Sequence, residues 1–250
     1  MLPDNRPIGP HLRTVLKRLK LGQLAEVLST RLAHARQAKQ DPEDFLLVLL
    51  EDETQRRRQN ASALRAAKAG LNAAMTLDGW NRQTAVRYDA ELLQRLMTLA
   101  FVERHQHVCA AGPVGVGKTM IAQGLGHIAS ARGKSVAYHS AVKLFAQLKV
   151  ARVDQTHTAQ MRHLTKVDLL IVDDFALHPM DMTATVDFTE IVTERHGAGS
   201  IIMTSNRDPS EWIALMAEPL LAQSAVDRFA NNALDLVLDG PSYRANLKPK

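Results

Sequence analysis

The chain of 250 residues contains one cysteine, few aromatic residues and no long apolar run. A single cysteine, Cys109, excludes an internal disulfide and a cysteine-based zinc cluster. No stretch reaches the roughly 18 uninterrupted apolar residues of a membrane span, and the first residues lack an apolar signal segment, so we expect a cytoplasmic protein with no membrane partner. Aromatic residues form only 4% of the sequence, which argues against base stacking as the main mode of nucleic-acid binding.

Charge and glycine content set the N-terminal part of the chain apart. Residues 1–80 hold 13 Lys/Arg and 9 Asp/Glu, a net charge of +4 out of the +5 of the whole chain. Between residues 11 and 70 glycine occurs only at 22 and 70, and good helix formers dominate. We therefore predict an all-α domain over residues 1–70, with two short helices interrupted near Gly22 and a third that begins at Asp41 and extends toward Lys68. Residues 71–84 are predicted to be a linker.

From about residue 85 onward, helical and strand-like patterns alternate, which is typical of a parallel sheet with crossover helices. The sequence therefore predicts an α/β domain over residues 85–250 with a five-stranded parallel sheet. The expected strands are 107–111, 135–140, 168–173, 200–205 and 234–238, and the expected helices are 89–104, 118–131, 141–152, 157–165, 181–196 and 218–230.

Residues Gly112-Pro-Val-Gly-Val-Gly-Lys-Thr119 match G-x-x-x-x-G-K-[ST], the loop that binds the phosphates of ATP or GTP. The backbone N–H groups of such a loop and the N-terminus of the following helix both attract phosphate oxygens. Lys118 would contact the β- and γ-phosphates, and Thr119 would hold Mg²⁺. Nucleotide contacts are predicted for Gly112, Pro113, Val114, Gly115, Val116, Gly117, Lys118, Thr119 and Met120.

Polar residues follow two further apolar runs of the predicted sheet. One run ends in Asp173 and Asp174, and the next ends just before Asn206. Because the carboxyl ends of parallel strands meet at the nucleotide, we expect Asp173 to support Mg²⁺, Asp174 to polarise the attacking water and Asn206 to stand between water and γ-phosphate. An exchange of the two acid roles stays open. Arg228 lies on a later predicted helix, and its permanently charged guanidinium suits a developing phosphoryl charge.

The phosphate loop, the two acids, Asn206 and Arg228 resemble, in this order and spacing, the AAA+ ATPases. Further segments resemble the IstB-like transposition helpers, in a group that includes the helicase loader DnaC, so that the resemblance covers almost the whole chain. These segments are 16–28, 53–58, Trp212 and 240–244. The resemblance implies a sheet of order 5-1-4-3-2, Walker A and Walker B roles for the loop and the aspartates, a sensor role for Asn206 and an arginine finger at Arg228.

The resemblance also implies partners and a mode of action. In this family the arginine finger acts in trans, so a homo-oligomer would form the complete sites. Such proteins assemble on duplex DNA, deform it and are dismantled by a transposase. We therefore expect ATP and Mg²⁺ as cofactors, and double-stranded DNA and a cognate transposase as partners. Hydrolysis of ATP to ADP and phosphate would act as the switch, and it is expected to be slow without DNA or transposase.

Three departures from the family pattern stand out. Asp174 occupies a position where most AAA+ proteins have glutamate, and the shorter side chain is expected to slow hydrolysis. Only 22 residues follow Arg228, which predicts a reduced or absent helical lid and leaves Arg244 as the nearby candidate for a second sensor. Pro241 replaces a glutamate of the family's C-terminal motif, so the role of that motif stays open.

Basic residues at helical spacing are the candidates for DNA contact, mainly with phosphates. A basic helix face is also typical of a simply solvated surface, so the sequence leaves each candidate open. The candidates are Arg13, Lys17, Lys20, Arg56, Arg57, Lys143, Lys149, Arg152, Arg162 and Lys166.

Three other functions share parts of this pattern. A helicase loader would use the same ATPase to hold a replicative helicase, although the N-terminal resemblance favours transposition. A small-molecule kinase would be a monomer and would need no Arg228 from a neighbour. A non-hydrolysing scaffold conflicts with the retained Lys118, Thr119, Asp173 and Asp174.

Overall fold

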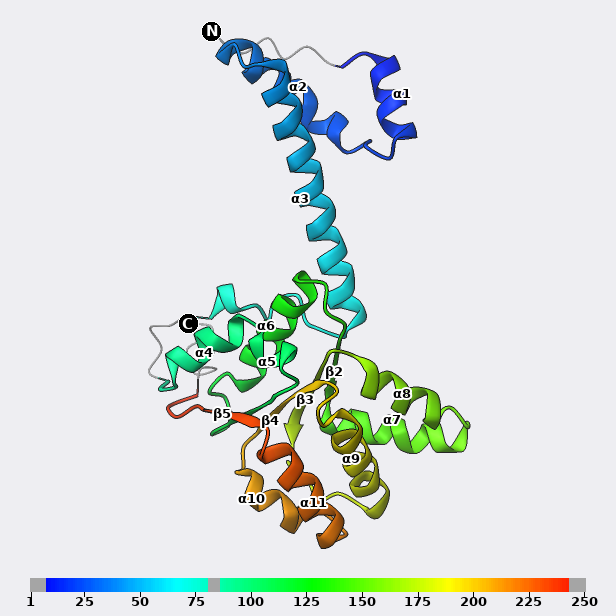
Figure 1. Cartoon of the computed structure of the whole chain (residues 1–250), viewed down its shortest axis with the longest axis vertical. Helices are drawn as coiled ribbons and strands as arrows, with labels where there is room; N and C mark the ends of the chain where they lie inside the picture. Colours follow the sequence, from blue (N-terminus) through cyan, green and yellow to red (C-terminus); the bar gives the residue numbers. More distant parts are fainter. Residues whose placement is uncertain (1–7, 81–85, 243–250) are drawn as a thin grey trace, which may run out of the picture. The chain divides into compact units, whose positions relative to one another are not determined.

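The computed structural model describes residues 8–80 and 86–242 of the chain (Figure 1). The chain divides into two compact units, Met1–Ala61 and Ser62–Lys250, each with its own apolar core. No helix in the described ranges is both long and apolar enough to cross a membrane.

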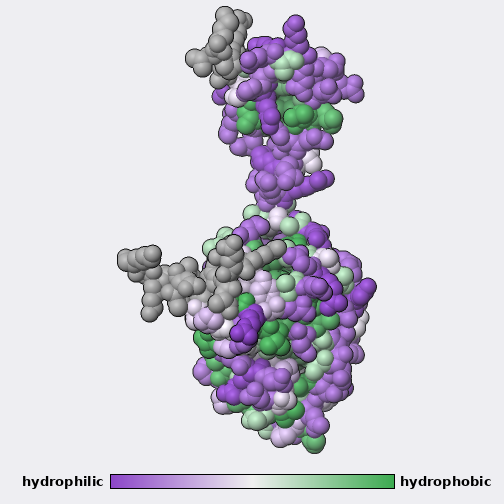
Figure 2. Space-filling view, turned by 90° about the vertical axis from the view of Figure 1, so that its left-hand side faces the viewer, coloured by the Kyte–Doolittle hydropathy of each residue, from purple (hydrophilic) through white to green (hydrophobic). Residues whose placement is uncertain are grey.

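The first unit is helical. It contains α1 (Pro10–Arg18), α2 (Leu24–Ala38) and the first part of α3 (Pro42–Lys68). The expected break near Gly22 is confirmed, because α1 ends before it and α2 begins after it. On α3, the buried carboxylate of Glu53 accepts hydrogen bonds from Arg56 and Arg57, which lower the pKa of this group to about 2. Hydrophilic residues cover most of the face of this unit seen in Figure 2.

A five-stranded parallel sheet forms the centre of the second unit. Its strands are β1 (His107–Ala111), β2 (Val136–Ser140), β3 (Leu169–Phe175), β4 (Ser200–Ser205) and β5 (Ala233–Val237). They lie in the order β2-β3-β4-β1-β5, which is the predicted order read from the opposite edge, so the prediction is confirmed. Residues of both faces of β3 and β4 are buried, as expected where helices cover a parallel sheet on both sides.

Helices cover both faces of this sheet (Figure 1). They are α4 (Ala90–Met97), α5 (Ala100–Glu103), α6 (Lys118–Ala131), α7 (Ala141–Val153), α8 (His157–Lys166), α9 (Met182–Arg195), α10 (Pro209–Trp212) and α11 (Pro219–Ala230), with short 3-10 turns at η1 (Leu77–Gly79) and η2 (Ile213–Leu215). The helices α4, α5 and α6 share one core, and α7, α8, α9 and α11 share the other. Successive strand residues alternate between these cores, so that Ile171 belongs to the first and Leu170 and Val172 belong to the second.

Two helix predictions are wrong in detail. The helix expected over 89–104 is divided into α4 and α5, because Leu99 takes a left-handed backbone with φ of 63°. The hydroxyl of Thr98 donates to the carbonyl of Arg95, a local bond that competes with the regular helix ladder. The short helix α10 was not predicted, although Asp208 and Glu211 form a capping box at its start.

Between β5 and residue 242 the described chain forms no helix. The candidate second sensor, Arg244, and the predicted linker residues 81–84 lie outside the described residues.

His107, at the start of β1, makes the stability of the second unit depend on pH. Its ring is fully buried, stacks on Phe229 and accepts a hydrogen bond from the N–H of Ile201 at 3.2 Å. Burial, with a smaller effect of Arg195, lowers the pKa of His107 from 6.5 to about 4. The unfolded chain therefore takes up this proton at a higher pH than the folded chain does. We expect full stability above pH 6.5 and a loss of about 3 kcal/mol as the pH falls toward 4.

Urea unfolding at several pH values measures this effect through tryptophan fluorescence, since Trp80 and Trp212 both lie in the second unit. His107→Asn retains an acceptor near the position of Nδ1 but does not titrate, so it should flatten the pH dependence. His105→Asn replaces an exposed histidine nearby and should leave the pH dependence unchanged. If the free energy of unfolding of His107→Asn fell with pH as steeply as that of the unmodified chain, His107 would not be the source of the pH dependence.

Candidate nucleotide-binding site

The phosphate loop connects β1 to α6 and leaves the N-terminus of α6 without a side-chain cap. The residue before α6, Gly117, has φ of 101°, a left-handed conformation that glycine adopts at little cost. Because Gly117 has no side chain, the first N–H groups of the helix stay available to an anion. The loop thus has the backbone geometry of a phosphate site. Of the other predicted contacts, Val116 is buried, Gly112, Gly115 and Met120 are half-buried, and Pro113 and Val114 are exposed.

Lys118 joins this loop to the end of β4. Its side chain is only 6% exposed. The ammonium Nζ donates to the carbonyls of Gly112 (2.6 Å) and Pro113 (2.7 Å) and to Oδ1 of Asn206 (2.6 Å). The structure therefore brings two predicted catalytic residues, Lys118 and Asn206, into direct contact. Phosphate oxygens placed in the loop would compete with these neutral acceptors for the ammonium, because bonds between two charged groups are stronger.

Asp173 lies buried at the end of β3 and accepts hydrogen bonds from three hydroxyl groups. Thr119 Oγ1 donates to its Oδ1 at 3.0 Å, and Tyr138 Oη donates to Oδ2 at 2.8 Å. The hydroxyl of Thr204 also donates to Oδ1. Burial, and then the bond to Asp173, raises the pKa of Tyr138, so the phenol keeps its proton. Tyr138 and Thr204 were not identified from the sequence, because they belong to no motif and meet Asp173 only through the arrangement of neighbouring strands.

Thr119 and Asp173 fit a Mg²⁺ ion that is held mainly by phosphate oxygens. A hydroxyl and a carboxylate oxygen 3.0 Å apart are hard donors of the type that this ion prefers. Mg²⁺ usually takes one or two protein ligands and completes its shell with phosphates and water. When bound, it would neutralise charge on the phosphates.

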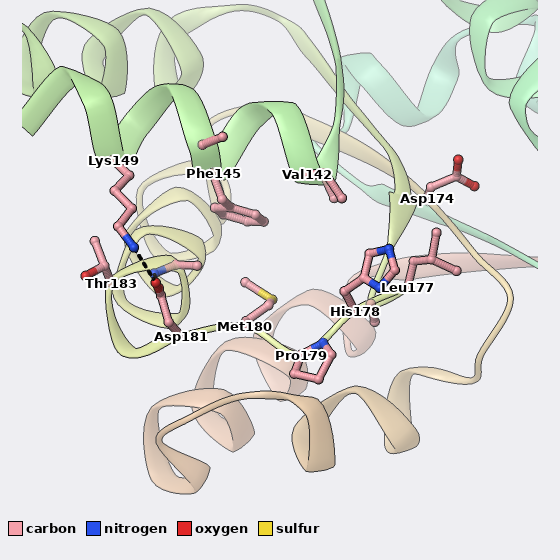
Figure 3. A pocket seen from close by; sticks show the side chains of 14 residues that line it. Val142, Phe145, Lys149, Asp174, Leu177, His178, Pro179, Met180, Asp181 and Thr183 are labelled. Carbon is pink, nitrogen blue, oxygen red and sulfur yellow. Dashed lines mark hydrogen bonds and ion pairs between the residues drawn. The ribbon is translucent and has the colours of Figure 1, made fainter.

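Asp174 faces different surroundings from Asp173 because β3 is irregular at this point. The register of β3 against β4 shifts between Val172 and Phe175, and Asp174 has a left-handed φ of 54°. Its N–H donates to the hydroxyl of Thr204 at 2.9 Å. The exposed carboxylate lies at one end of a cavity of about 310 Å³ (Figure 3). The two adjacent acids are therefore positioned for different tasks.

Arg228 is not brought to the phosphate loop within one chain. It lies exposed on α11, where its Nη1 donates to Ser224 Oγ at 2.6 Å. Within residues 8–80 and 86–242, no described hydrogen bond or ion pair connects Arg228 with Lys118, Asp173 or Asn206. The role of Arg228 as an arginine finger therefore stays a prediction.

The segment that precedes the sheet lies along α6 and reaches the phosphate loop. Near the end of α6, Arg65 Nε donates to the carbonyl of Ser130 at 2.8 Å. At the start of α6, the indole of Trp80 covers Gly117 so closely that an added Cβ there would lie 2.2 Å from the ring. Trp80 Nε1 also donates to Tyr88 Oη at 3.1 Å. This contact between linker and phosphate loop was not predicted.

Four of the ten predicted DNA-binding side chains contact polar groups of the chain itself. The contacts are Arg56 and Arg57 with Glu53, Arg57 with the carbonyl of Lys20, Lys149 with Asp181 and Arg152 with Asp187. The remaining six candidates, which lie on the exposed surface, are Arg13, Lys17, Lys20, Lys143, Arg162 and Lys166. A DNA duplex would have to compete with internal carboxylates for the four side chains of the first group.

Comparisons with known proteins agree on one family. The family model of IstB-like ATP binding proteins matches residues 14–250. An ATP-binding protein in an insertion sequence of Mycobacterium tuberculosis is 33% identical over 241 residues, which is 96% of this chain and 96% of the relative. The ATP-binding protein of insertion sequence IS21 from Pseudomonas aeruginosa is 30% identical over 239 residues, 96% of this chain and 90% of the relative.

Solved structures share the fold of the second unit. AMPPCP-bound DnaA from Aquifex aeolicus aligns with a TM-score of 0.55 and 23% identity, over 66% of this chain and 51% of that chain. The DnaC helicase loader aligns with a TM-score of 0.51 and 18% identity, over 59% of this chain and 86% of that chain. At these identities the likeness concerns the fold, which is the predicted α/β fold with a five-stranded parallel sheet.

Proposed function

The chain belongs to the family of IstB-like ATP-binding proteins, and from this premise we propose that it is an ATPase that assembles on duplex target DNA during transposition. The observation that supports hydrolysis best is the direct contact of Lys118 with Asn206, beside the bond of Thr119 to Asp173. These contacts bring a phosphate-binding cation, a water-positioning amide and a Mg²⁺-binding pair to one edge of the sheet.

In the proposed reaction the chain's own groups position the phosphates and the attacking water. The N-terminus of α6 binds the phosphates, and Lys118 exchanges the carbonyls of Gly112 and Pro113 for phosphate oxygens. Lys118 also gives up its bond to Oδ1 of Asn206, which is then free to orient water, and Asp174 accepts a proton from that water as it attacks the γ-phosphate. The bond from the γ-phosphorus to the bridging oxygen breaks, and ADP and phosphate result.

A neighbouring subunit completes the site in this proposal. Arg228 is exposed, and its guanidinium suits the charge that develops on the transferred phosphoryl group. ATP would therefore favour assembly, because it is bound fully only where two subunits meet. The exposed basic residues would hold DNA phosphates, and a cognate transposase would dismantle the assembly as ATP is hydrolysed.

Sizing on duplex DNA tests this function. We expect large protein–DNA assemblies with Mg²⁺ and a non-hydrolysable ATP analogue, and their loss with ADP or without nucleotide. Phosphate contacts predict that binding weakens as salt rises, with a similar affinity for unrelated duplex sequences. Assembly of the same extent without nucleotide would contradict the proposed coupling, and a stable monomer that phosphorylates a small molecule would support the kinase alternative.

A further inference from the structure

We propose that α11 of one copy docks on α7 of the next, with Leu220 and Leu221 entering the cavity beside Asp174. This contact rests on the proposed function, because it assumes that a neighbour supplies Arg228. The docking adds to the proposed function the surface that the neighbour contacts.

The cavity lies between α7 and the connection from β3 to α9 (Figure 3). Its walls are mainly apolar and include Val142, Phe145, Leu177 and Met180. Asp174 stands at one end and the ion pair of Lys149 with Asp181 at the other (Figure 3). Val142 and Lys149 are seven residues apart on α7, so the cavity extends for about 10 Å along this helix. A volume of about 310 Å³ admits more than one aliphatic side chain.

The outer side of α7 is apolar although the chain leaves it uncovered. Its inner residues Leu144 and Leu148 are buried in the core. Val142, Val150 and Val153 on the same helix are 55%, 62% and 84% exposed. The exposed Lys143 and Lys149 flank this apolar stripe. An exposed apolar stripe with a polar rim has the composition of an interface.

α11 carries two exposed leucines, and the distance of Leu221 from Arg228 along the helix matches the length of the cavity. Leu220 is 77% exposed and Leu221 is 37% exposed. Leu221, Ser224 and Arg228 recur at helical spacing on one side of α11, with Leu221 about 10 Å from Arg228 along the axis. This separation equals the length of the cavity. An Arg228 that reaches the phosphates beside Asp174 thus places Leu221 of the same helix inside the cavity.

Charge and topology both fit a head-to-tail contact between copies. Residues 208–230, which lead into and form α11, contain four Asp/Glu and one Lys/Arg, Arg228. Residues 141–166, which span α7 and α8, contain five Lys/Arg and one Asp, and two of the five, Lys149 and Arg152, form ion pairs within the chain. α7 packs against β2 and β3 and α11 against β1 and β5, toward opposite edges of the sheet. Complementary surfaces at opposite edges pair heterologously, and such a contact repeats from copy to copy.

Cysteine cross-linking tests the docking directly. The native Cys109 is buried, and burial raises the pKa of its thiol to about 12, so it stays unreactive. Chains with Leu221→Cys and chains with Val142→Cys are mixed with duplex DNA, Mg²⁺ and a non-hydrolysable ATP analogue. Mild oxidation should link them into a covalent dimer, and neither variant alone should be linked. As a control, chains with Leu64→Cys, which replaces another exposed leucine, are mixed with the Val142→Cys chains. This mixture should form no covalent dimer.

The outcomes separate this inference from the proposed function. A covalent dimer that requires the ATP analogue supports the docking. Assemblies of normal size whose cysteines stay reduced would overturn the docking and leave the proposed function intact, and α7 would then face DNA or another protein. Failure of the unmodified chain to assemble under the same conditions would refute the proposed function and the docking with it.

Discussion

Lys118→Ala is expected to weaken ATP binding by at least about 100-fold and to abolish assembly on DNA. Each hydrogen bond from an ammonium to a charged phosphate contributes about 1.5–3 kcal/mol, and a 100-fold change corresponds to about 3 kcal/mol. Nζ is already fixed within 2.7 Å of the carbonyls of Gly112 and Pro113. It is therefore held at the loop before the nucleotide arrives, and on binding it exchanges these neutral acceptors for charged phosphate oxygens, which bind an ammonium more strongly.

Calorimetric titration with ATP and Mg²⁺ measures this loss, and sizing on duplex DNA measures assembly. Lys134→Ala is the matched control, because it removes a lysine whose partner is Glu103, at 2.6 Å, beyond the end of α6. This control should bind ATP as the unmodified chain does. Thermal unfolding without nucleotide separates loss of the site from loss of the fold. If Lys118→Ala keeps its fold and binds ATP within a few-fold of the unmodified chain, the loop is not the principal ATP site.

Arg228→Ala is expected to lower ATP hydrolysis by about 10³-fold, the size of effect attributed to arginine fingers. The affinity of the single chain for ATP should change little, because Arg228 lies on α11 and donates to Ser224 and not to the phosphate loop. Its side chain is exposed, so the substitution should leave the stability of the fold nearly unchanged.

Phosphate release in the presence of duplex DNA measures the effect of Arg228→Ala. Arg104→Ala, which removes another exposed arginine, serves as the control and should hydrolyse ATP at the normal rate. Hydrolysis by Arg228→Ala at an undiminished rate would show that the guanidinium does not act on the phosphates of a neighbour.

The fold and the phosphate loop could be predicted because each is encoded in contiguous residues. The loop from Gly112 to Thr119 is a local pattern, and the alternation of apolar strands with amphipathic helices indicates a parallel sheet. The strand order came from the family resemblance, whereas the direct contact of Lys118 with Asn206, which are 88 residues apart, was not predicted. Contiguous patterns do not specify such distant contacts.

Other parts of the site depend on tertiary contacts that no local pattern encodes. Tyr138 and Thr204 reach Asp173 only because β2, β3 and β4 are neighbours in the sheet. Trp80 lies on Gly117 because the preceding segment follows α6 along its length. The break at Leu99 had a local signal in Thr98, but the helical periodicity of the surrounding residues outweighed it.

A mixture of two inactive variants tests most directly whether a neighbour completes each ATP site. Asp174→Asn removes the proposed proton acceptor but retains Arg228, and Arg228→Ala removes the finger but retains Asp174. In a mixed assembly on duplex DNA, Arg228 of the first variant completes the site of the second. Phosphate release by the mixture should therefore rise well above the sum of the separate rates. Release equal to that sum, from assemblies that contain both variants, would contradict a site shared between subunits.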